Sequence, residues 1–163
     1  MTRVPDDLRG GEAVASAITN DEWMRYLKDD TLPTPSAAEA GGTLARIAAA
    51  HDLTFFAHYS TDTAGHRGGI DGATQAVERV DEFLGGIAGG LQPNTDLLVC
   101  SDHGNVEDAR TGHTLNPSLG LLVGAGAIEF DPSTLTSLTE IPRFVFDTLG
   151  IDPLRDGDAH SAE

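Results

Sequence analysis

Cysteine, lysine and the larger aromatic residues are scarce in this chain of 163 residues. Its one cysteine, Cys100, excludes an internal disulfide framework and a zinc cluster built from thiolates, and it ends an apolar run typical of a buried strand. No apolar run reaches the roughly 18 residues that a membrane-spanning helix needs, and no apolar stretch follows Met1 as in a signal peptide. These absences favour a soluble, cytoplasmic protein with no membrane partner.

Basic residues are also few, because Lys and Arg total 10 against 26 Asp and Glu, which gives a formal net charge of −16. Such a charge argues against binding to nucleic acid, whose phosphates attract Lys and Arg, and against an anionic membrane surface. Two interpretations of the acidic composition stay open. One is a halophilic protein with a hydrated acidic surface, and the other is an ordinary acidic protein from a high-GC bacterium.

The length suits one globular domain of ordinary size. We expect an irregular or helical N-terminal segment over residues 1–35, followed by an α/β domain over residues 36–163. Ser36 and Glu39 have the spacing of a capping box, which predicts that a helix begins there. The glycine pair at 41–42 weakens that prediction.

Three short apolar runs, at residues 53–59, 96–100 and 119–123, predict buried strands. A periodic apolar face predicts a long helix that starts at Asp71, and a last helix is expected near residues 139–149. Apolar strands joined by a helix are typical of parallel sheets. The expected fold class is therefore α/β, with a mostly parallel sheet flanked by helices.

Ligand-type side chains gather in the loops that follow the predicted strands. In open parallel sheets, ligands bind beyond the carboxyl ends of the strands. Carboxylate oxygen together with neutral imidazole nitrogen is the donor mixture that suits zinc, manganese or a similar divalent ion. The sequence therefore predicts a metal site that draws on Asp62, His66, Asp102, His103 and His113.

Spacing says more about these five residues. Asp62 and His66 are four apart, so they would point the same way on a helical turn. Asp102 and His103 are adjacent, and neighbours at a strand end diverge, which suits two ions with one on each side. Any one of these residues alone would ordinarily be an exposed loop residue without a metal. The prediction therefore rests on the occurrence of all five together.

Two glycines lie beside the candidate ligands. Gly65 precedes His66, and Gly104 follows His103. Both fit a backbone that must bend sharply near a ligand. An ordinary alternative exists here too, because Asp102 could cap a helix that begins at Gly104.

Three segments of the chain resemble motifs of the alkaline phosphatase superfamily. They are Asp-Thr-Ala-Gly-His at 62–66, Ser-Asp-His-Gly-Asn-Val-Glu at 101–107 and His-Thr-Leu-Asn-Pro at 113–117. In particular, they resemble the metalloenzyme domain of cofactor-independent phosphoglycerate mutase and phosphopentomutase, and the resemblance covers residues 50–125 best. It implies a metal-dependent phosphoryl-transfer enzyme of the phosphatase or phosphomutase type, acting on a small phosphorylated substrate.

The resemblance also implies a site for two divalent ions, with manganese or zinc expected. Matched residue by residue, Asp62, His66 and His113 would hold one ion. In the family, the Asp and His that correspond to Asp102 and His103 belong to the second ion. The family's nucleophile, a Ser or Thr, lies between the ions.

The N-terminal segment departs from the family pattern. The family supplies its nucleophile and a further carboxylate from an apolar strand that ends in Asp-Gly, and residues 1–35 contain no such strand. We therefore expect about one ion in this chain, no catalytic residue among those present, and either self-association or a missing N-terminal half as partner. A non-catalytic metal-binding domain that lacks the nucleophile is the alternative function.

Overall fold

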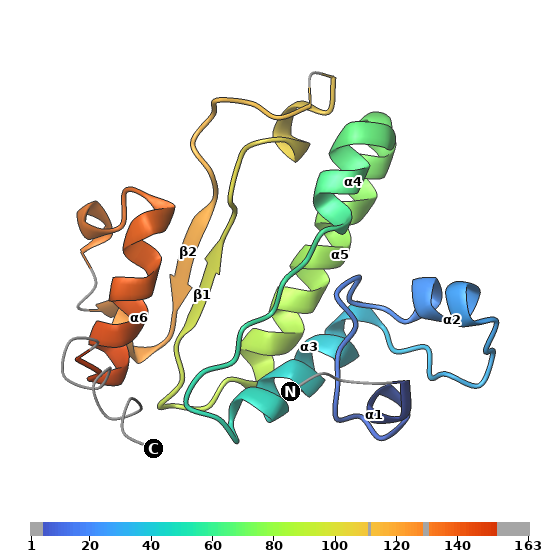
Figure 1. Ribbon diagram of the computed structural model, residues 1–163, viewed down its shortest axis with the longest axis horizontal. Helices are drawn as coiled ribbons and strands as arrows, with labels where there is room; N and C mark the ends of the chain where they lie inside the picture. The colour runs from blue at the N-terminus through green and yellow to red at the C-terminus, as the bar shows by residue number, and fades with distance from the viewer. Residues whose placement is uncertain (1–4, 111, 129–130, 153–163) are drawn as a thin grey trace, which may run out of the picture. The chain divides into compact units, whose positions relative to one another are not determined.

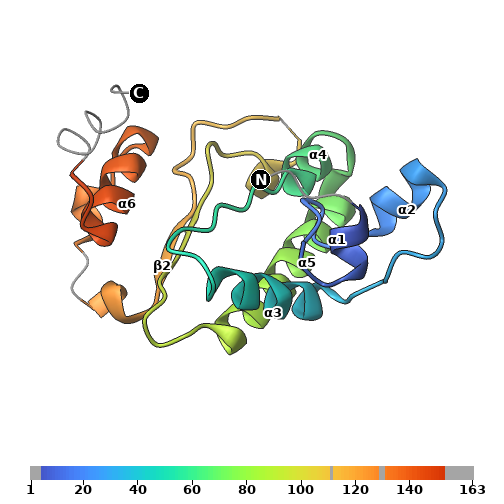
Figure 2. The ribbon, with the colours of Figure 1, turned by 60° about the horizontal axis from the view of Figure 1, so that its bottom comes forward.

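The computed structural model describes residues 5–110, 112–128 and 131–152. It divides into two compact units, Met1–Ala125 and Gly126–Glu163. All five candidate ligands lie in the first unit, which Figures 1 and 2 show from two directions. Its helices and strands are α1 (Pro5–Arg9), α2 (Asp21–Leu27), α3 (Ala37–Ala48), α4 (Ser60–Arg67), α5 (Gly69–Gly90), β1 (Leu97–Cys100), η1 (Val106–Asp108) and β2 (Gly120–Val123).

Helix α3 begins where the sequence predicts. The Ser36 side chain accepts a hydrogen bond from the Glu39 N–H at 3.2 Å, and the Glu39 carboxylate accepts one from the Ser36 N–H at 2.8 Å. This reciprocal pair satisfies two backbone donors that the first turn would otherwise leave unpaired. The capping box is therefore confirmed.

The core of the first unit lies where α3 crosses α5. Phe83 and Ile87 of α5 are each 4% exposed and pack among small side chains of α3. Glycine permits this close crossing, since a Cβ on Gly41 would overlap the Phe83 carbonyl oxygen and a Cβ on Gly86 would overlap the Ala38 carbonyl oxygen. Of the two glycines that weaken the helix prediction on propensity grounds, Gly41 is thus explained by packing between the two helices, whereas nothing lies within 4 Å of a Cβ on Gly42.

The sheet differs from the expected one. Strands β1 and β2 pair antiparallel, from Leu97 opposite Val123 to Cys100 opposite Gly120. The chain between them forms loops and the short helix η1, without the crossover helix that a parallel pair requires. The α/β class is confirmed, whereas the described residues contain no parallel pairing. The strands are partly rather than fully buried, and Cys100 is exposed.

The first predicted strand, at residues 53–59, is wrong. This segment joins α3 to α4 as a stretch without strand pairing in the described part of the chain (Figure 1). A strand is stable through hydrogen bonds to a neighbour, and an apolar sequence cannot supply the neighbour. Phe56 holds the segment against α5, with its ring 5.2 Å from that of Phe83, while Phe55 is 88% exposed.

The residues after this segment also differ from expectation. The polar stretch predicted as a loop, residues 60–69, folds into helix α4 and the start of α5. No proline interrupts it, and the Thr63 N–H donates to the Tyr59 carbonyl at 3.1 Å to open the helix. The long helix α5 then begins at Gly69, two residues before the predicted start.

The second unit contains η3 (Pro132–Thr134), η4 (Leu138–Glu140) and α6 (Ile141–Leu149), while η2 (Ala125–Ile128) spans the boundary. Pro142 lies in the first turn of α6, where its missing N–H costs no helical hydrogen bond. No helix among residues 5–110, 112–128 and 131–152 is long and apolar enough to cross a membrane. The domain boundary expected at residues 35–36 stays a prediction.

Two adjacent glycines of α5 provide a test of the crossing. Gly86→Ala should lower the free energy of unfolding by about 1–3 kcal/mol, because the new methyl group has no room against α3. Gly85→Ala is the matched control, since nothing lies within 4 Å of its Cβ position and alanine favours helix by about 0.5–1 kcal/mol. Urea denaturation measures both variants. Equal stability of the two would contradict the assigned role of Gly86.

Candidate metal centre

Helix α4 carries the first two candidate ligands. Asp62 and His66 are one helical turn apart, and Asp62 Oδ1 lies 3.4 Å from His66 Nε2. The helix forms over the polar residues 60–67 and turns both side chains in the same direction. The expectation drawn from their spacing is confirmed.

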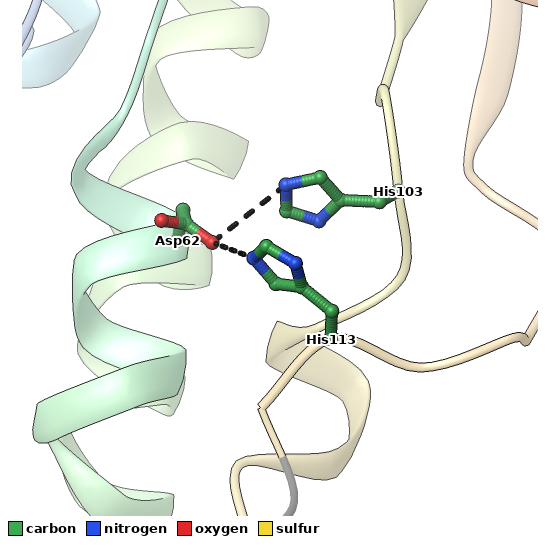
Figure 3. Close-up of side chains that lie close together, drawn as sticks. All are labelled: Asp62, His103 and His113. Atoms are coloured by element: carbon green, nitrogen blue, oxygen red, sulfur yellow. Dashed lines mark hydrogen bonds and ion pairs between the residues drawn. The ribbon is translucent and has the colours of Figure 1, made fainter.

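The loops after β1 carry His103 and His113. An isolated pairing between Gly104 and Thr114, with the Thr114 N–H donating to the Gly104 carbonyl at 2.8 Å, joins these loops one residue beyond each histidine. The two imidazoles consequently lie side by side, with ring centroids 3.8 Å apart. Figure 3 shows both rings facing Asp62 from the side opposite α4.

The donor atoms of these residues converge. His113 Nε2 lies 3.2 Å from Asp62 Oδ1 and 3.1 Å from His66 Nε2. His103 Nε2 lies 3.8 Å from the same Asp62 oxygen. Asp62, His103 and His113 each offer a ligand atom within 4.8 Å of the others.

These separations fit a common cation. Ligand atoms about 2.1 Å from one ion lie about 3.0 Å apart at a right angle and about 3.4 Å apart at the tetrahedral angle. The distances of 3.1, 3.2 and 3.4 Å among the donor atoms of Asp62, His66 and His113 fall near this range. The donor set, one carboxylate oxygen and imidazole nitrogens, also suits zinc or manganese.

Asp102 lies at the margin of the cluster. Its side chain is 77% exposed, and its Oδ1 is 3.6 Å from His103 Nε2. His103 thus stands between the two carboxylates of Asp62 and Asp102. The structure brings all five predicted residues to one place, with Asp102 the most solvent-exposed of them.

A buried amide fixes the carboxylate of Asp62. Asn105 is 4% exposed, and its Nδ2 donates to Asp62 Oδ1 at 2.5 Å and to the Asp62 carbonyl at 3.2 Å. This side chain joins α4 to the loop that carries His103. The oxygen that it binds, Oδ1, is also the one that faces the imidazoles.

The glycines beside the ligands have a different role from the expected one. Gly65 lies within α4 rather than at a bend, and a Cβ there would overlap the Asn105 side chain. A Cβ on Gly104 would overlap the hydroxyl of Thr114 and the carboxylate of Glu107. Both positions need glycine because another side chain packs against the backbone, and at Gly65 the chain is helical rather than sharply bent.

Opposing effects set the ionisation of Asp62. Partial burial raises its pKa. Hydrogen bonds from Asn105 and His113 lower it, as do the positive charges that His66 and His113 can carry. These lowering effects are the larger, so the pKa of Asp62 lies below its ordinary value. The carboxylate is therefore ionised at neutral pH. This is the form that can bind a cation.

Sequence reasoning missed the residues that support the ligands. Asn105 and Glu107 stand in a recognisable motif, but neither is predicted to act in the site. Asn105 reaches a partner 43 residues away, and Glu107 accepts hydrogen bonds from residues up to 9 positions away across a loop. No periodicity marks contacts of this kind. The sequence signal for Asn105 and Glu107 was their position within the motif at residues 101–107.

The geometry agrees with what comparison with known proteins shows. A model of the metalloenzyme superfamily matches residues 27–153. The chain therefore belongs to the metalloenzyme superfamily, which confirms the family inferred from the motifs and is consistent with the alkaline phosphatase superfamily. Membership of this family implies a divalent metal ion.

Curated relatives give a more particular likeness. The chain is 35% identical over 131 residues to the 2,3-bisphosphoglycerate-independent phosphoglycerate mutase of Rhodopseudomonas palustris, over 70% of this chain and 26% of the relative. It is 36% identical over 130 residues to the enzyme of that name from Haloarcula marismortui, over 68% of this chain and 24% of the relative. The chain thus spans about a quarter of the length of these relatives. No solved structure matches it.

The amide contact yields a prediction about ionisation. In Asn105→Ala the pKa of Asp62 should rise, because a hydrogen bond that lowers it is lost. A carboxyl group whose pKa is lower in the folded state than its unfolded value near 3.9 stabilises the fold at pH values above that range. The stabilisation is lost as the pH falls and the group takes up a proton. Asn105→Ala should therefore lower the free energy of unfolding at neutral pH, and the part of this loss that comes from Asp62 should disappear in acid.

Carbon-detected NMR titration of the Asp62 carboxyl measures this change. Asn94→Ala, which removes an exposed amide from the turn before β1, is the control and should leave the titration unchanged. An Asp62 titration identical in Asn105→Ala and the wild type would refute the assigned contact.

Proposed function

We propose that this chain is the metal-binding portion of a divalent-metal-dependent phosphoryl-transfer enzyme of the phosphatase or phosphomutase type. The observation that carries the proposal is the convergence of Asp62 Oδ1 with the Nε2 atoms of His66 and His113, at 3.4 and 3.2 Å. The names of the relatives support the phosphomutase type.

Asp62, His66 and His113 would hold one ion, and Asp102 and His103 would contribute to a second. Manganese or zinc suits this set of oxygen and nitrogen donors. When bound, such an ion polarises a phosphoryl oxygen and offsets the charge that develops on it. A small phosphorylated molecule is the proposed substrate.

The residues of this chain prepare the site in two ways. The Asp62 carboxylate is kept ionised and oriented by the Asn105 amide. Helix α4 presents His66 on the same face as Asp62. Ligands held in place in this way lose less conformational entropy when an ion binds.

The hydroxyl groups beside the ligands support the expectation that the nucleophile lies elsewhere. The Ser101 hydroxyl donates to the His103 carbonyl at 2.7 Å. The Thr114 hydroxyl donates to the Glu107 carboxylate. Both hydroxyls therefore take part in contacts that hold the loops together. The same observation favours the second candidate function, a non-catalytic metal-binding domain.

Exposed apolar side chains support a further protein partner. Phe55 is 88% exposed and Tyr59 is 67% exposed in the segment between α3 and α4, and Leu119 and Leu121 are 60% and 42% exposed at β2. Large apolar side chains exposed to solvent are typical of positions that another chain covers. An N-terminal portion of the enzyme, or a second copy of this chain, is the proposed partner.

The metal site is tested by calorimetry with Mn²⁺ and Zn²⁺. The wild-type chain should bind about one ion, and His66→Ala and His113→Ala should each weaken binding at least tenfold. Binding should also weaken as the pH falls below about 6.5, where imidazoles ordinarily take up a proton and lose the lone pair that ligates. His51→Ala, an exposed histidine after α3, is the matched control. Unchanged binding in both His66→Ala and His113→Ala would contradict the ligand assignment.

Hydrolysis of an aryl phosphate separates the two candidate functions. The chain alone, with Mn²⁺ or Zn²⁺, should give no turnover above background, because the nucleophile and part of the second ion's ligand set are lacking. Adding the remaining portion of a relative in trans should produce metal-dependent turnover if the chain is part of an enzyme. Turnover by the chain alone that Asp102→Ala abolishes would show that the nucleophile is present after all.

A further inference from the structure

The carboxylate of Glu107 joins the two loops that carry His103 and His113. Glu107 lies in the short helix η1, and its Oε2 accepts a hydrogen bond from the Asn105 N–H at 2.6 Å. Its Oε1 accepts from the Thr114 hydroxyl and from Asn116 Nδ2, the latter at 3.0 Å. One side chain therefore holds two segments that are separated in the sequence.

These contacts lie beside the histidines. Thr114 directly follows His113, and Asn105 follows His103 by two positions. Between the backbones of the two loops, the Gly104–Thr114 pairing contributes one hydrogen bond, at 2.8 Å. A single backbone bond leaves a loop free to twist, and the Glu107 carboxylate adds two further bonds between the loops, from Thr114 and Asn116.

Glu107 also acts on the third ligand through Asn105. It fixes the Asn105 backbone, and the Asn105 amide in turn holds Asp62 on α4. The absence of a Cβ at Gly104 gives the Glu107 carboxylate and the Thr114 hydroxyl the space they occupy. The chain is thus built locally to admit this carboxylate.

We propose that Glu107 is a positioning residue for the metal centre, which sets the spacing of His103 and His113 relative to Asp62 without binding an ion itself. This inference rests on the proposed function, in which these side chains are ligands. Three hydrogen bonds occupy most of the lone pairs of the Glu107 carboxylate.

The charge of Glu107 is permanent under ordinary conditions. Hydrogen bonds from Thr114 and Asn116 lower the pKa of Glu107 to about 2. The carboxylate consequently accepts all three hydrogen bonds across the pH range in which imidazoles are neutral. Charge-assisted bonds of this kind are stronger than neutral ones.

Cobalt titration of the full chain tests the proposal, because Co²⁺ reports its ligand geometry through visible absorption. Glu107→Ala should raise the Kd for Co²⁺ about 10–100-fold and alter the absorption spectrum, as is typical when a group that orients ligands is removed. Glu107→Gln keeps one acceptor oxygen and should restore part of the affinity and spectrum. Glu78→Ala, an exposed glutamate of α5, makes the same charge change and should match the wild type.

The outcomes separate the inference from the proposed function. Absence of Co²⁺ binding by the folded wild-type chain overturns the proposed function. Wild-type binding together with an unchanged Kd and spectrum in Glu107→Ala overturns the positioning role, even if its unfolding temperature falls. If Glu107→Ala does not fold, Thr114→Val tests the positioning role instead, because it removes one hydrogen-bond donor to Glu107 with little change of side-chain shape. An unchanged Kd and spectrum in that variant would also overturn the role.

Discussion

The hydrogen bond from the Asn105 amide to the Asp62 carboxylate is the contact on which the rest of the centre depends. It links α4 to the loop after β1 across 43 residues of sequence, and its donor is nearly inaccessible to water because Asn105 is 4% exposed. His66 approaches Asp62 from α4, His103 from this loop, and His113 from the loop after η1, which the Gly104–Thr114 pairing joins to the first. If α4 turned away from the loop, His66 would leave with Asp62, and both would separate from His103 and His113.

This arrangement brings together imidazoles that do not all attract one another. Protonated imidazoles attract the Asp62 carboxylate but repel one another, and two neutral imidazoles repel where their lone pairs face each other. His66 Nε2 and His113 Nε2 are nevertheless 3.1 Å apart. A cation between the donors would turn this repulsion into attraction, which is the physical reason that metal centres collect such residues. The surrounding hydrogen bonds supply the rigidity that holds the donors close.

The parts of the structure that depend on neighbours in sequence were predictable. The capping box at Ser36 and Glu39 involves atoms three residues apart, and the common direction of Asp62 and His66 follows from helical geometry. The proximity of the five candidate ligands was also predictable, because ligand-type side chains cluster after apolar runs, while their role as ligands stays a prediction. Their assignment to two ions stays a prediction.

The parts that depend on distant partners were not predictable. The apolar run at residues 53–59 was taken for a strand, yet strand formation depends on a neighbour that the run itself does not specify. The direction of pairing between β1 and β2 depends on the path of a loop, not on the apolar residues of either strand. Asn105 and Glu107 were missed because their partners become neighbours only after the loops fold.

The exposure of the two carboxylates bears on how many ions this chain can retain. The Asp62 side chain is 41% exposed and has hydrogen bonds from Asn105, whereas Asp102 is 77% exposed and lies 3.6 Å from His103. A well-hydrated carboxylate must give up more water to bind an ion, and solvent screens its charge. We therefore expect the donors around Asp62 to retain a cation more readily than those around Asp102. In the proposed two-ion site, the second ion would depend on further ligands from another segment or molecule.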